Sequence, residues 1–334
     1  MWLAFERAVE CVLTLFLLGM VGFVLAKRGH VADETRKLLP RFVLHFCLPP
    51  YILYSVYTGF SRDELVHLFY GSFIPAASIT LTFVLAALAA RWLNFDKARR
   101  SIFALSCSIS NTMLIGMPVN ITLFGEAAVP YVLLYYFANT AFFWTVGNYS
   151  LSRASRFAGV PMFSLRNLKQ VVTPPMVAVV LALTLVAFSV PLPNFVLSSA
   201  HYMGSMTTAM AMIFIGVTLS NLRFSELKVD RDIWLVMFGR FVVCPASVFA
   251  AALIAGGLTG LFPFPAAMAD VWGHPSTLML QVFIIQAGLP AGTLIPLLSA
   301  YYQLDISFAT VLISLSVLLS MIVIPVTMVI VSLM

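Results

Sequence analysis

The chain has 334 residues, of which 61% are hydrophobic and only 10% charged, and its mean hydropathy is +0.99. A soluble globular domain has roughly 45–50% apolar and about 25% charged residues, so this composition excludes a cytosolic enzyme, a disordered protein and a nucleic-acid module. The net charge of +6 comes from basic residues that lie between apolar runs, where the positive-inside rule places them, and therefore indicates no nucleic-acid partner. The composition predicts a polytopic membrane protein whose surroundings are the lipid bilayer.

Ten apolar runs are long enough to cross the hydrocarbon core as helices, which takes about 20 residues each. In chain order they cover residues 5–26, 39–58, 66–90, 101–124, 127–150, 171–190, 196–220, 233–258, 276–299 and 306–333. The connections are short, and the longest is a central basic segment. We therefore predict a first five-helix repeat over residues 1–152, a cytoplasmic loop over 153–170 and a second five-helix repeat over 171–334.

The basic residues predict the orientation of these helices. Sixteen of the 19 Lys and Arg residues lie in the connections after the first, third, fifth and seventh runs, whereas Arg7 and Arg62 lie on the opposite side and Arg240 lies within a run. The positive-inside rule places the basic connections in the cytoplasm. We therefore expect a multi-pass protein of the cell inner (plasma) membrane with both termini outside the cytoplasm.

The two halves share short sequence signatures in the same order. Residues 59–65 resemble residues 223–227, residues 70–78 resemble 238–247, and residues 115–118 resemble 287–290. An odd number of helices per repeat inserts the second copy upside down, as in secondary transporters, whose binding site lies between the repeats. The predicted fold class is an all-α integral membrane protein with ten transmembrane helices in two inverted five-helix repeats.

Proline and glycine interrupt the fourth and ninth runs at matching positions. Proline removes a backbone donor and clashes with the preceding turn, and glycine eases unwinding. The predicted helix-break residues are Gly116, Pro118, Gly288, Pro290 and Gly292. At membrane depth an unwound backbone is tolerated only where protein or a water-filled cavity satisfies it. We expect the second half-helices to begin just after Pro118 and Pro290, where their positive N-terminal ends suit an anion, and unwound carbonyls suit a cation.

Polar side chains surround both breaks. Such side chains often serve only to join helices, but two polar breaks at matching positions favour a binding site. All 13 acidic residues lie in loops or near the ends of runs, so no central carboxylate relay is expected and an organic anion is favoured over a metal cation. The candidate substrate-binding residues are Asn111, Thr112, Asn120, Gln286 and Thr293.

Two ionisable residues within the runs, His45 and Arg240, are candidates for coupling or for charge pairing. Arg240 is placed either to bind a substrate carboxylate through two hydrogen bonds or to extend its charge to the membrane interface. An imidazole changes charge near neutral pH, so His45 either links proton movement to transport or bonds a backbone carbonyl. The sequence leaves both interpretations open for each residue.

Motifs of other protein classes are missing from the sequence. It contains no HExxH motif, no P-loop lysine and no Ser-His-Asp pattern in loops, so we expect neither an enzyme nor ATP-driven transport by this chain, and no cofactor. The four cysteines lie inside apolar runs without paired spacing, which predicts neither disulfides nor a metal site.

The fourth and fifth runs carry motifs that resemble those of the auxin efflux carrier family. Residues 110–119 (SNTMLIGMPV), residues 123–125 (LFG) and the fifth run from Leu134 through Asn139 to Gly147 are similar to that family, as are residues 287–301 in the ninth run. The central connection is short, and Met117-Pro118 and Leu289-Pro290 stand where plant PIN auxin exporters have Asn-Pro. The chain is therefore most similar to prokaryotic short-loop members of the malonate and dicarboxylate carrier type.

This resemblance implies a secondary active transporter of small organic anions, namely mono- and dicarboxylates such as malonate. It implies a scaffold of helices 1, 2, 6 and 7 that forms homodimers, and a mobile bundle of the other six helices. Broken helices 4 and 9 would cross in that bundle beside the substrate, which would move by an elevator-like alternating-access mechanism. The alternatives are a sodium-coupled symporter like the bile-acid symporters, with Gln281 and Gln286 near the ion, an auxin-like weak-acid exporter, and a channel.

Overall fold

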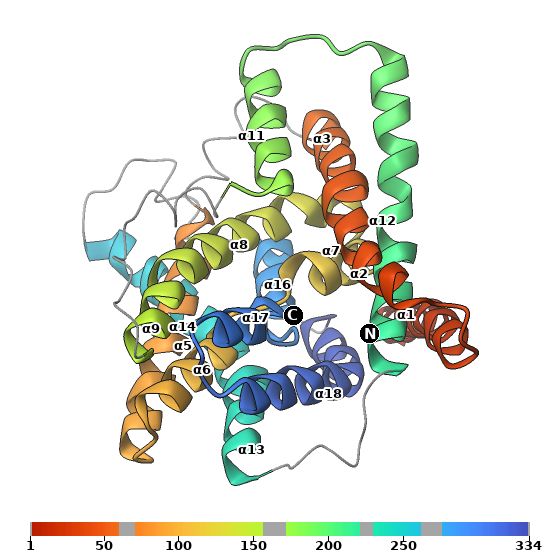
Figure 1. The fold of residues 1–334 in the computed structure, drawn as a ribbon. Coiled ribbons are helices and arrows are strands. Elements are labelled where there is room, and N and C mark those ends of the chain that lie inside the picture. Colours follow the sequence, from red (N-terminus) through yellow and green to blue (C-terminus); the bar gives the residue numbers. More distant parts are fainter. Residues whose placement is uncertain (1, 60–70, 156–171, 221–229, 262–275, 333–334) are drawn as a thin grey trace.

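The computed structural model describes residues 2–59, 71–155, 172–220, 230–261 and 276–332, and the regular elements in these ranges are all helices (Figure 1). The first half contains α1 (Trp2–Lys27), α2 (Asp33–Phe42), η1 (Val43–Cys47), α3 (Leu48–Gly59), α5 (Phe73–Trp92), α6 (Lys97–Ser108), η2 (Thr112–Gly116), α7 (Met117–Phe124), η3 (Glu126–Ala128), α8 (Val129–Phe142), η4 (Phe143–Gly147) and α9 (Asn148–Ala154). The second half contains α11 (Pro174–Ala187), α12 (Asn194–Ser220), α13 (Arg231–Phe238), η6 (Gly239–Val243), α14 (Cys244–Leu261), α16 (Thr277–Ala287), α17 (Leu294–Tyr301) and α18 (Ile306–Ser332). The described part is thus all-α, as the sequence predicts.

Several helices are suited to a bilayer by length and composition. Four long apolar helices of the described part meet this test, over Phe73–Trp92, Asn194–Ser220, Arg231–Gly257 and Ile306–Val331. Their outward side chains include large apolar ones, such as Leu253 at 77% exposure and Ile322 at 66%. Contiguous exposed apolar surface of this kind is typical of a face that contacts lipid. The number of ten spans stays a prediction, because parts of the predicted runs, including residues 66–70, lie outside the described residues.

The helices pack as two groups. The scaffold group, defined as α1, α2, η1, α3, α11 and α12, is held together by α12, which packs along α1 and α3, and by α11, which packs on α3. Figure 1 shows α3, α11 and α12 standing side by side, with α1 next to the lower part of α12. The crossover group contains the other elements, in which α5 packs against α6, α8 and α14, and α14 packs against α16. The two groups touch where α1 meets α18 and where α3 meets α8.

Glycine allows the closest helix approach in the scaffold group. A Cβ atom at Gly22 of α1 would overlap the carbonyl of Ile213 in α12, and a Cβ at Gly216 of α12 would overlap the carbonyl of Gly19 in α1. Small residues at such crossings let two backbones come into contact, which is a common source of helix association in membranes.

Wide helical turns interrupt several of the predicted runs. The π-helical turns η1, η2 and η6 each precede a helix with proline near its start, at Pro49, Pro118 and Pro245 respectively. Because proline has no N–H, a carbonyl of the preceding turn loses its usual partner. That turn then closes with a hydrogen bond that spans five residues along the chain instead of four, as from the Leu48 nitrogen to the Val43 oxygen. Single π-helical turns are frequent at functional sites.

A buried serine pair joins the third and eighth predicted runs. The hydroxyl oxygens of Ser78 in α5 and Ser247 in α14 lie 2.6 Å apart, and Thr82 donates to the Ser247 hydroxyl at 2.9 Å. Ser78 and Ser247 end two of the matching sequence signatures, so the repeat hypothesis makes them equivalent. The first signature pair, residues 59–65 and 223–227, falls mainly outside the described residues, and the division into inverted halves stays a prediction.

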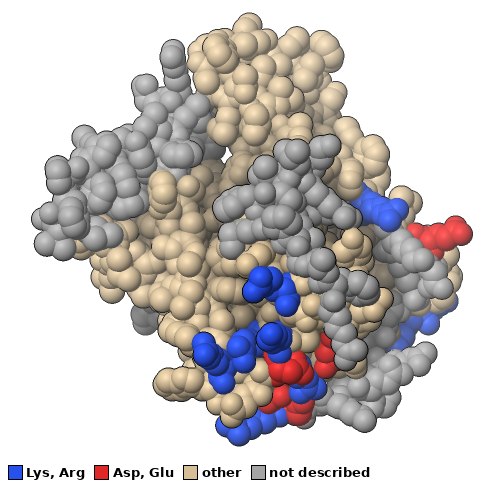
Figure 2. Space-filling view, turned by 60° about the vertical axis from the view of Figure 1, so that its left-hand side comes forward, with Lys and Arg blue, Asp and Glu red and all other residues tan. Residues whose placement is uncertain are grey.

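Charged side chains gather toward one end of the molecule (Figure 2). There the Arg99 guanidinium of α6 lies 3.2 Å from the Asp232 carboxylate of α13 and 3.3 Å from the Asp305 carboxylate before α18. The Arg99 side chain also covers the Phe308 ring at 4.7 Å. These contacts join the N-terminal ends of α6, α13 and α18 at one end of the crossover group.

Candidate functional site

Two interruptions of the helical backbone meet in the crossover group. The first, at Ile109–Asn111, separates α6 from η2 and α7, and the second, at residues 288–293, separates α16 from α17. The Asn111 nitrogen donates to the Pro290 oxygen at 2.9 Å, and the Gly292 nitrogen donates to the Ile109 oxygen at 3.0 Å. Ser110 and Ala291 thereby form an isolated antiparallel bridge. Each unwound segment thus supplies hydrogen-bond partners for backbone groups of the other. Non-helical backbone at membrane depth needs such partners.

A side chain from a neighbouring helix braces each interruption. Asn139 of α8 accepts from the Ser110 nitrogen at 3.0 Å through Oδ1 and donates to the Ser110 oxygen at 3.1 Å through Nδ2. The Ser316 hydroxyl of α18 accepts from the Ala291 nitrogen at 3.2 Å. The two bracing residues belong to the fifth and tenth predicted runs, which correspond in the two halves.

Arg240 of η6 lies behind this crossover with its side chain fully buried. Its Nε donates to the Leu289 oxygen at 2.7 Å, Nη1 donates to the Cys107 oxygen at 3.0 Å, and Nη2 donates to the Ala287 oxygen at 2.7 Å and to the Ser110 hydroxyl. A guanidinium held in this way does not extend to the membrane interface, so the interfacial interpretation of Arg240 is wrong. Four of its five N–H donors are engaged with the protein, and Arg240 acts here on the backbone of the crossover.

A cavity of about 410 Å³ lies on the other side of the crossover. It is lined by η1, the start of α11, both interruptions, α8 and η4, so both helix groups contribute to its wall. Its lining residues are Leu44, His45, Ile109, Ser110, Asn111, Thr112, Met113, Leu114, Tyr136, Asn139, Thr140, Phe143, Trp144, Val172, Thr173, Pro174, Pro175, Gly292, Thr293 and Leu294. The volume is sufficient for a small organic molecule.

The N-terminal ends of two half-helices open into this cavity. Asn111 precedes η2 and Thr293 precedes α17, and neither side chain caps the helix that follows it among the described residues. The first N–H groups of a helix have no partner within the helix and carry its positive partial charge. The cavity therefore presents hydrogen-bond donors at two positive helix ends, together with the amide and hydroxyl groups of its lining.

The predicted substrate-binding residues divide between the cavity and the protein interior. Asn111, Thr112 and Thr293 line the cavity. Asn120 and Gln286 are fully buried on the far side of η2. The Asn120 Nδ2 donates to the Gly116 oxygen at 2.8 Å, and a Cβ on Gly116 would overlap the amide of Gln286.

The predicted helix-break residues also divide. Gly288, Pro290 and Gly292 lie in the second interruption, and Gly292 lines the cavity. Gly116 ends η2 and Pro118 lies in the first turn of α7, so the first interruption precedes both of them. The prediction that the first half-helix starts just after Pro118 is therefore wrong. Pro118 fits at this point because the wide turn η2, which runs directly into α7, closes without the N–H that proline lacks.

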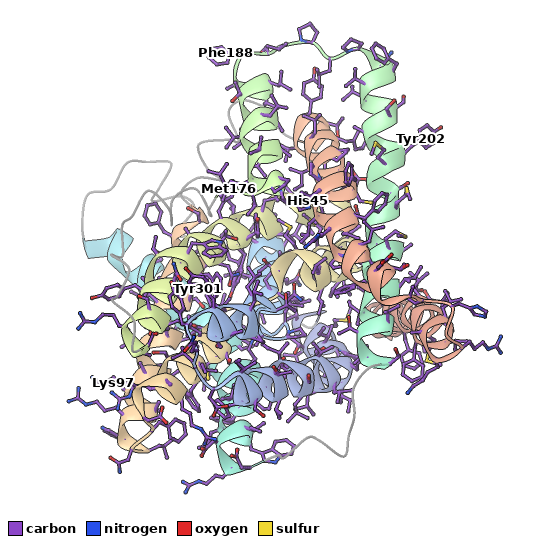
Figure 3. All side chains as sticks on the ribbon, in the orientation of Figure 1. His45, Lys97, Met176, Phe188, Tyr202 and Tyr301 are labelled. Carbon is purple, nitrogen blue, oxygen red and sulfur yellow. The ribbon has the colours of Figure 1, made fainter. Side chains whose placement is uncertain are left out.

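His45 contributes an imidazole to the cavity wall. Its Nδ1 lies 3.0 Å from the Arg41 oxygen one turn earlier, and the side chain is exposed to the cavity. In Figure 3, His45 lies at the inner end of α3, close to the start of α11 that Met176 marks, while Lys97 lies at the opposite end of the crossover group. The backbone bond expected for His45 is present, and the imidazole also faces the cavity.

Several residues that line the cavity are not among the predicted substrate-binding residues. They include Asn139, Tyr136 and Thr140 from one run, and Ser110 in the first interruption. Asn139 carried a usable signal, since an amide in the middle of an apolar run needs a partner at membrane depth. Thr173, near the start of the sixth run, gave no such signal, because a threonine at a helix start is an ordinary capping residue.

The profile of the family described as membrane transport proteins matches residues 7–328. The chain belongs to this family, that of the auxin efflux carriers. An "uncharacterized transporter" of Methanothermobacter thermautotrophicus is 24% identical over 324 residues, which are 96% of this chain and 97% of the relative. The "uncharacterized transporter MJ1031" of Methanocaldococcus jannaschii is 22% identical over 302 residues, 89% of this chain and 90% of the relative.

The family resemblance drawn from the fourth, fifth and ninth runs is thereby confirmed. Membership in the auxin efflux carrier family makes the chain a membrane transport protein, and its relatives are named as transporters and not as enzymes.

Proposed function

We propose that the chain is a secondary active transporter of small organic anions, namely mono- and dicarboxylates such as malonate. It would work in the inner membrane with both termini outside the cytoplasm, by an elevator-like alternating-access movement and without a cofactor. The observation that carries the proposal is the cavity at the crossover, into which two uncapped helix N-termini open.

The chemistry of the cavity favours an anion over a cation. Its lining contains no Asp or Glu in the described part of the chain, whereas Asn111, Thr112, Thr293 and Asn139 contribute amides and hydroxyls. Positive helix ends and neutral donors stabilise a carboxylate without a full positive charge, so the anion is bound and also released. No group of His, Cys, Asp and Glu in the described residues is arranged to hold a metal ion.

The arrangement of the helix groups supports the elevator-like movement. Both interruptions belong to the crossover group, while His45 and residues 172–175 of the cavity wall belong to the scaffold group. A shift of one group against the other would carry the two helix N-termini past the scaffold wall and change the side from which the cavity is reached. The same scaffold group would form the homodimer that the family resemblance implies.

Uptake into proteoliposomes tests the proposal. Purified protein would be exposed to labelled malonate, malate, acetate and indole-3-acetate under pH, sodium and voltage gradients imposed in turn. We expect saturable malonate uptake that Thr293→Val lowers, because this change keeps the side-chain shape and removes a cavity hydroxyl. Thr310→Val is the matched control, since the Thr310 hydroxyl bonds the Ile306 oxygen of its own exposed helix.

Each outcome of this experiment has a meaning. Uptake of none of these acids would overturn the proposal, and conductance without saturation would indicate a channel. Preference for indole-3-acetate would indicate a weak-acid exporter. Strict sodium dependence would indicate the symporter alternative, for which Gln286 is the better-placed residue. Both amide atoms of Gln286 lack hydrogen-bond partners among the described residues, whereas Gln281 donates to the Val331 oxygen at 2.9 Å.

A further inference from the structure

The partners of Arg240 are the C-terminal ends of the two first half-helices. Cys107 lies in the last turn of α6, Ala287 ends α16 and Leu289 follows it, and Arg240 donates to the backbone oxygens of all three. The C-terminal end of a helix carries a negative partial charge of about half an elementary charge. The described residues place no carboxylate against Arg240, so two helix ends together compensate its charge.

The crossover is therefore divided by charge. On one side, the two negative helix ends meet the Arg240 guanidinium inside the protein. On the other side, the two positive helix ends open into the cavity. Only the short interruptions separate the negative ends of α6 and α16 from the cavity. Without Arg240, these negative ends would therefore repel an anion bound there.

Ser110 connects the two sides. Its hydroxyl accepts a hydrogen bond from Arg240 Nη2, and the same residue lines the cavity. Asn139 fixes its backbone on both edges. A hydroxyl that accepts from a guanidinium turns its own hydrogen away from that cation, which leaves it free to donate elsewhere.

We infer that Arg240 is a positioning residue that sets the charge preference of the cavity for anions, an inference that rests on the proposed function. Arg240 cancels the negative ends of α6 and α16, holds both interruptions in one unit and orients the Ser110 hydroxyl. It does this from behind the cavity wall and without contact to the substrate.

The test compares two substrates of equal size and different charge. Malonate is a dianion at neutral pH, and malonamate replaces one carboxylate by a neutral amide. In Arg240→Gln we expect the KM for malonate to rise roughly tenfold and that for malonamate about threefold, so that the preference for the dianion falls about threefold. Arg240→Lys keeps the charge but not the bond geometry, and should weaken both substrates while the preference stays as in the wild type.

Two matched variants separate charge from structure. Ser316→Ala removes a crossover hydrogen bond without a change in charge and outside the cavity wall, and should weaken both substrates in equal proportion. Arg153→Gln removes an exposed positive charge and should leave both KM values unchanged. If Arg240→Gln weakens both substrates equally, as Ser316→Ala does, the inference is wrong. If the Gln variant does not fold, a changed preference in Arg240→Lys contradicts the inference and an unchanged preference supports it.

A measurement without substrate keeps this inference separate from the proposed function. If the wild type takes up no carboxylate, the proposed function fails, and hydrogen–deuterium exchange of the purified protein still tests the role of Arg240 at the crossover. The Asn111 and Gly292 amides join the two interruptions. We expect them to exchange at least roughly tenfold faster in Arg240→Gln than in the wild type, because local opening costs less. Unchanged exchange at both amides would overturn the inference.

Discussion

Gly116 lies where η2 passes α16 in the crossover group. A Cβ at this position would overlap the amide of Gln286 and the side chain of Leu289. Gly116→Ala should lower the free energy of unfolding by about 1–3 kcal/mol, the usual effect of overpacking, and should reduce uptake. Thermal unfolding in detergent measures the first effect. Gly257→Ala is the control: outside its own helix backbone, no atom of the described residues lies within 4 Å of its Cβ, and alanine favours a helix.

Asn139 replaces the helical partners that Ser110 has lost. Asn139→Ala leaves the nitrogen and the oxygen of Ser110 without this partner in a buried position, and each unpaired group costs about 1–3 kcal/mol. We expect a loss of stability on the order of 2 kcal/mol or more, measured by denaturant unfolding. Asn194→Ala, which changes an exposed amide, should have little effect. Equal stability of the two variants would show that Asn139 does not brace the interruption.

Site residues were predictable from the sequence where they lie directly beside a proline- and glycine-rich helix break. Asn111, Thr112 and Thr293 lie beside the unwound chain and line the cavity. The partners of Arg240 were not predictable, because they come from two runs, the fourth and the ninth, that only tertiary packing brings to the eighth run. The burial of Arg240 in turn contradicts its interfacial interpretation.

At the scale of the elements, the contact between α1 and α12 depends on which glycine faces the partner backbone. Gly216→Ala would overlap the Gly19 carbonyl, whereas a Cβ on Gly19 would lie 3.8 Å from the Met212 oxygen, an ordinary contact. We expect Gly216→Ala to separate the two helices and to lower the thermal unfolding midpoint by several degrees, since a loss of about 1 kcal/mol shifts it by roughly 2–4 °C in a large domain. Gly19→Ala should leave the midpoint within about 1 °C of the wild type on the same scale. Equal midpoints for both variants would contradict the observed packing.

The broken helices show what a pattern of prolines does and does not predict. Pro290 and its glycines lie in the second interruption, but the first interruption lies before Gly116 and Pro118. The difference arises because Pro118 lies in the first turn of α7, and the preceding π-helical turn η2 closes without the backbone hydrogen bond that proline cannot donate. The actual position of the first interruption depends on the Pro290 oxygen and on Asn139, which are remote in sequence.

At the scale of the whole molecule, composition and apolar runs were sufficient for the class of an all-α membrane protein, and the family motifs were sufficient for a transporter. The grouping into scaffold and crossover helices required contacts between distant runs, such as α1 with α12. One arrangement agrees with the charge pattern. Arg99, Asp232 and Asp305 lie in the connections after the third, seventh and ninth runs, which the predicted orientation places together in the cytoplasm. In the structure the Arg99 guanidinium contacts both carboxylates.

The elevator-like proposal requires the crossover group to move against the scaffold group while each group stays rigid. Ser55 of α3 and Glu126 of η3 lie across the boundary, with the Ser55 hydroxyl 3.5 Å from the Glu126 Oε2. Ser101 of α6 and Ser150 of α9 lie within the crossover group, with hydroxyl oxygens 3.0 Å apart. In a background without native cysteines, a short bis-methanethiosulfonate, which couples to both thiols through disulfides, should lower malonate uptake of Ser55→Cys/Glu126→Cys to the level of empty liposomes, because it fixes one group to the other. The same reagent on Ser101→Cys/Ser150→Cys should leave most of the uptake, and a reductant should restore it in the first pair. Full uptake by the first pair, with cross-linking verified by mass spectrometry, would rule out relative movement of the two groups at this boundary.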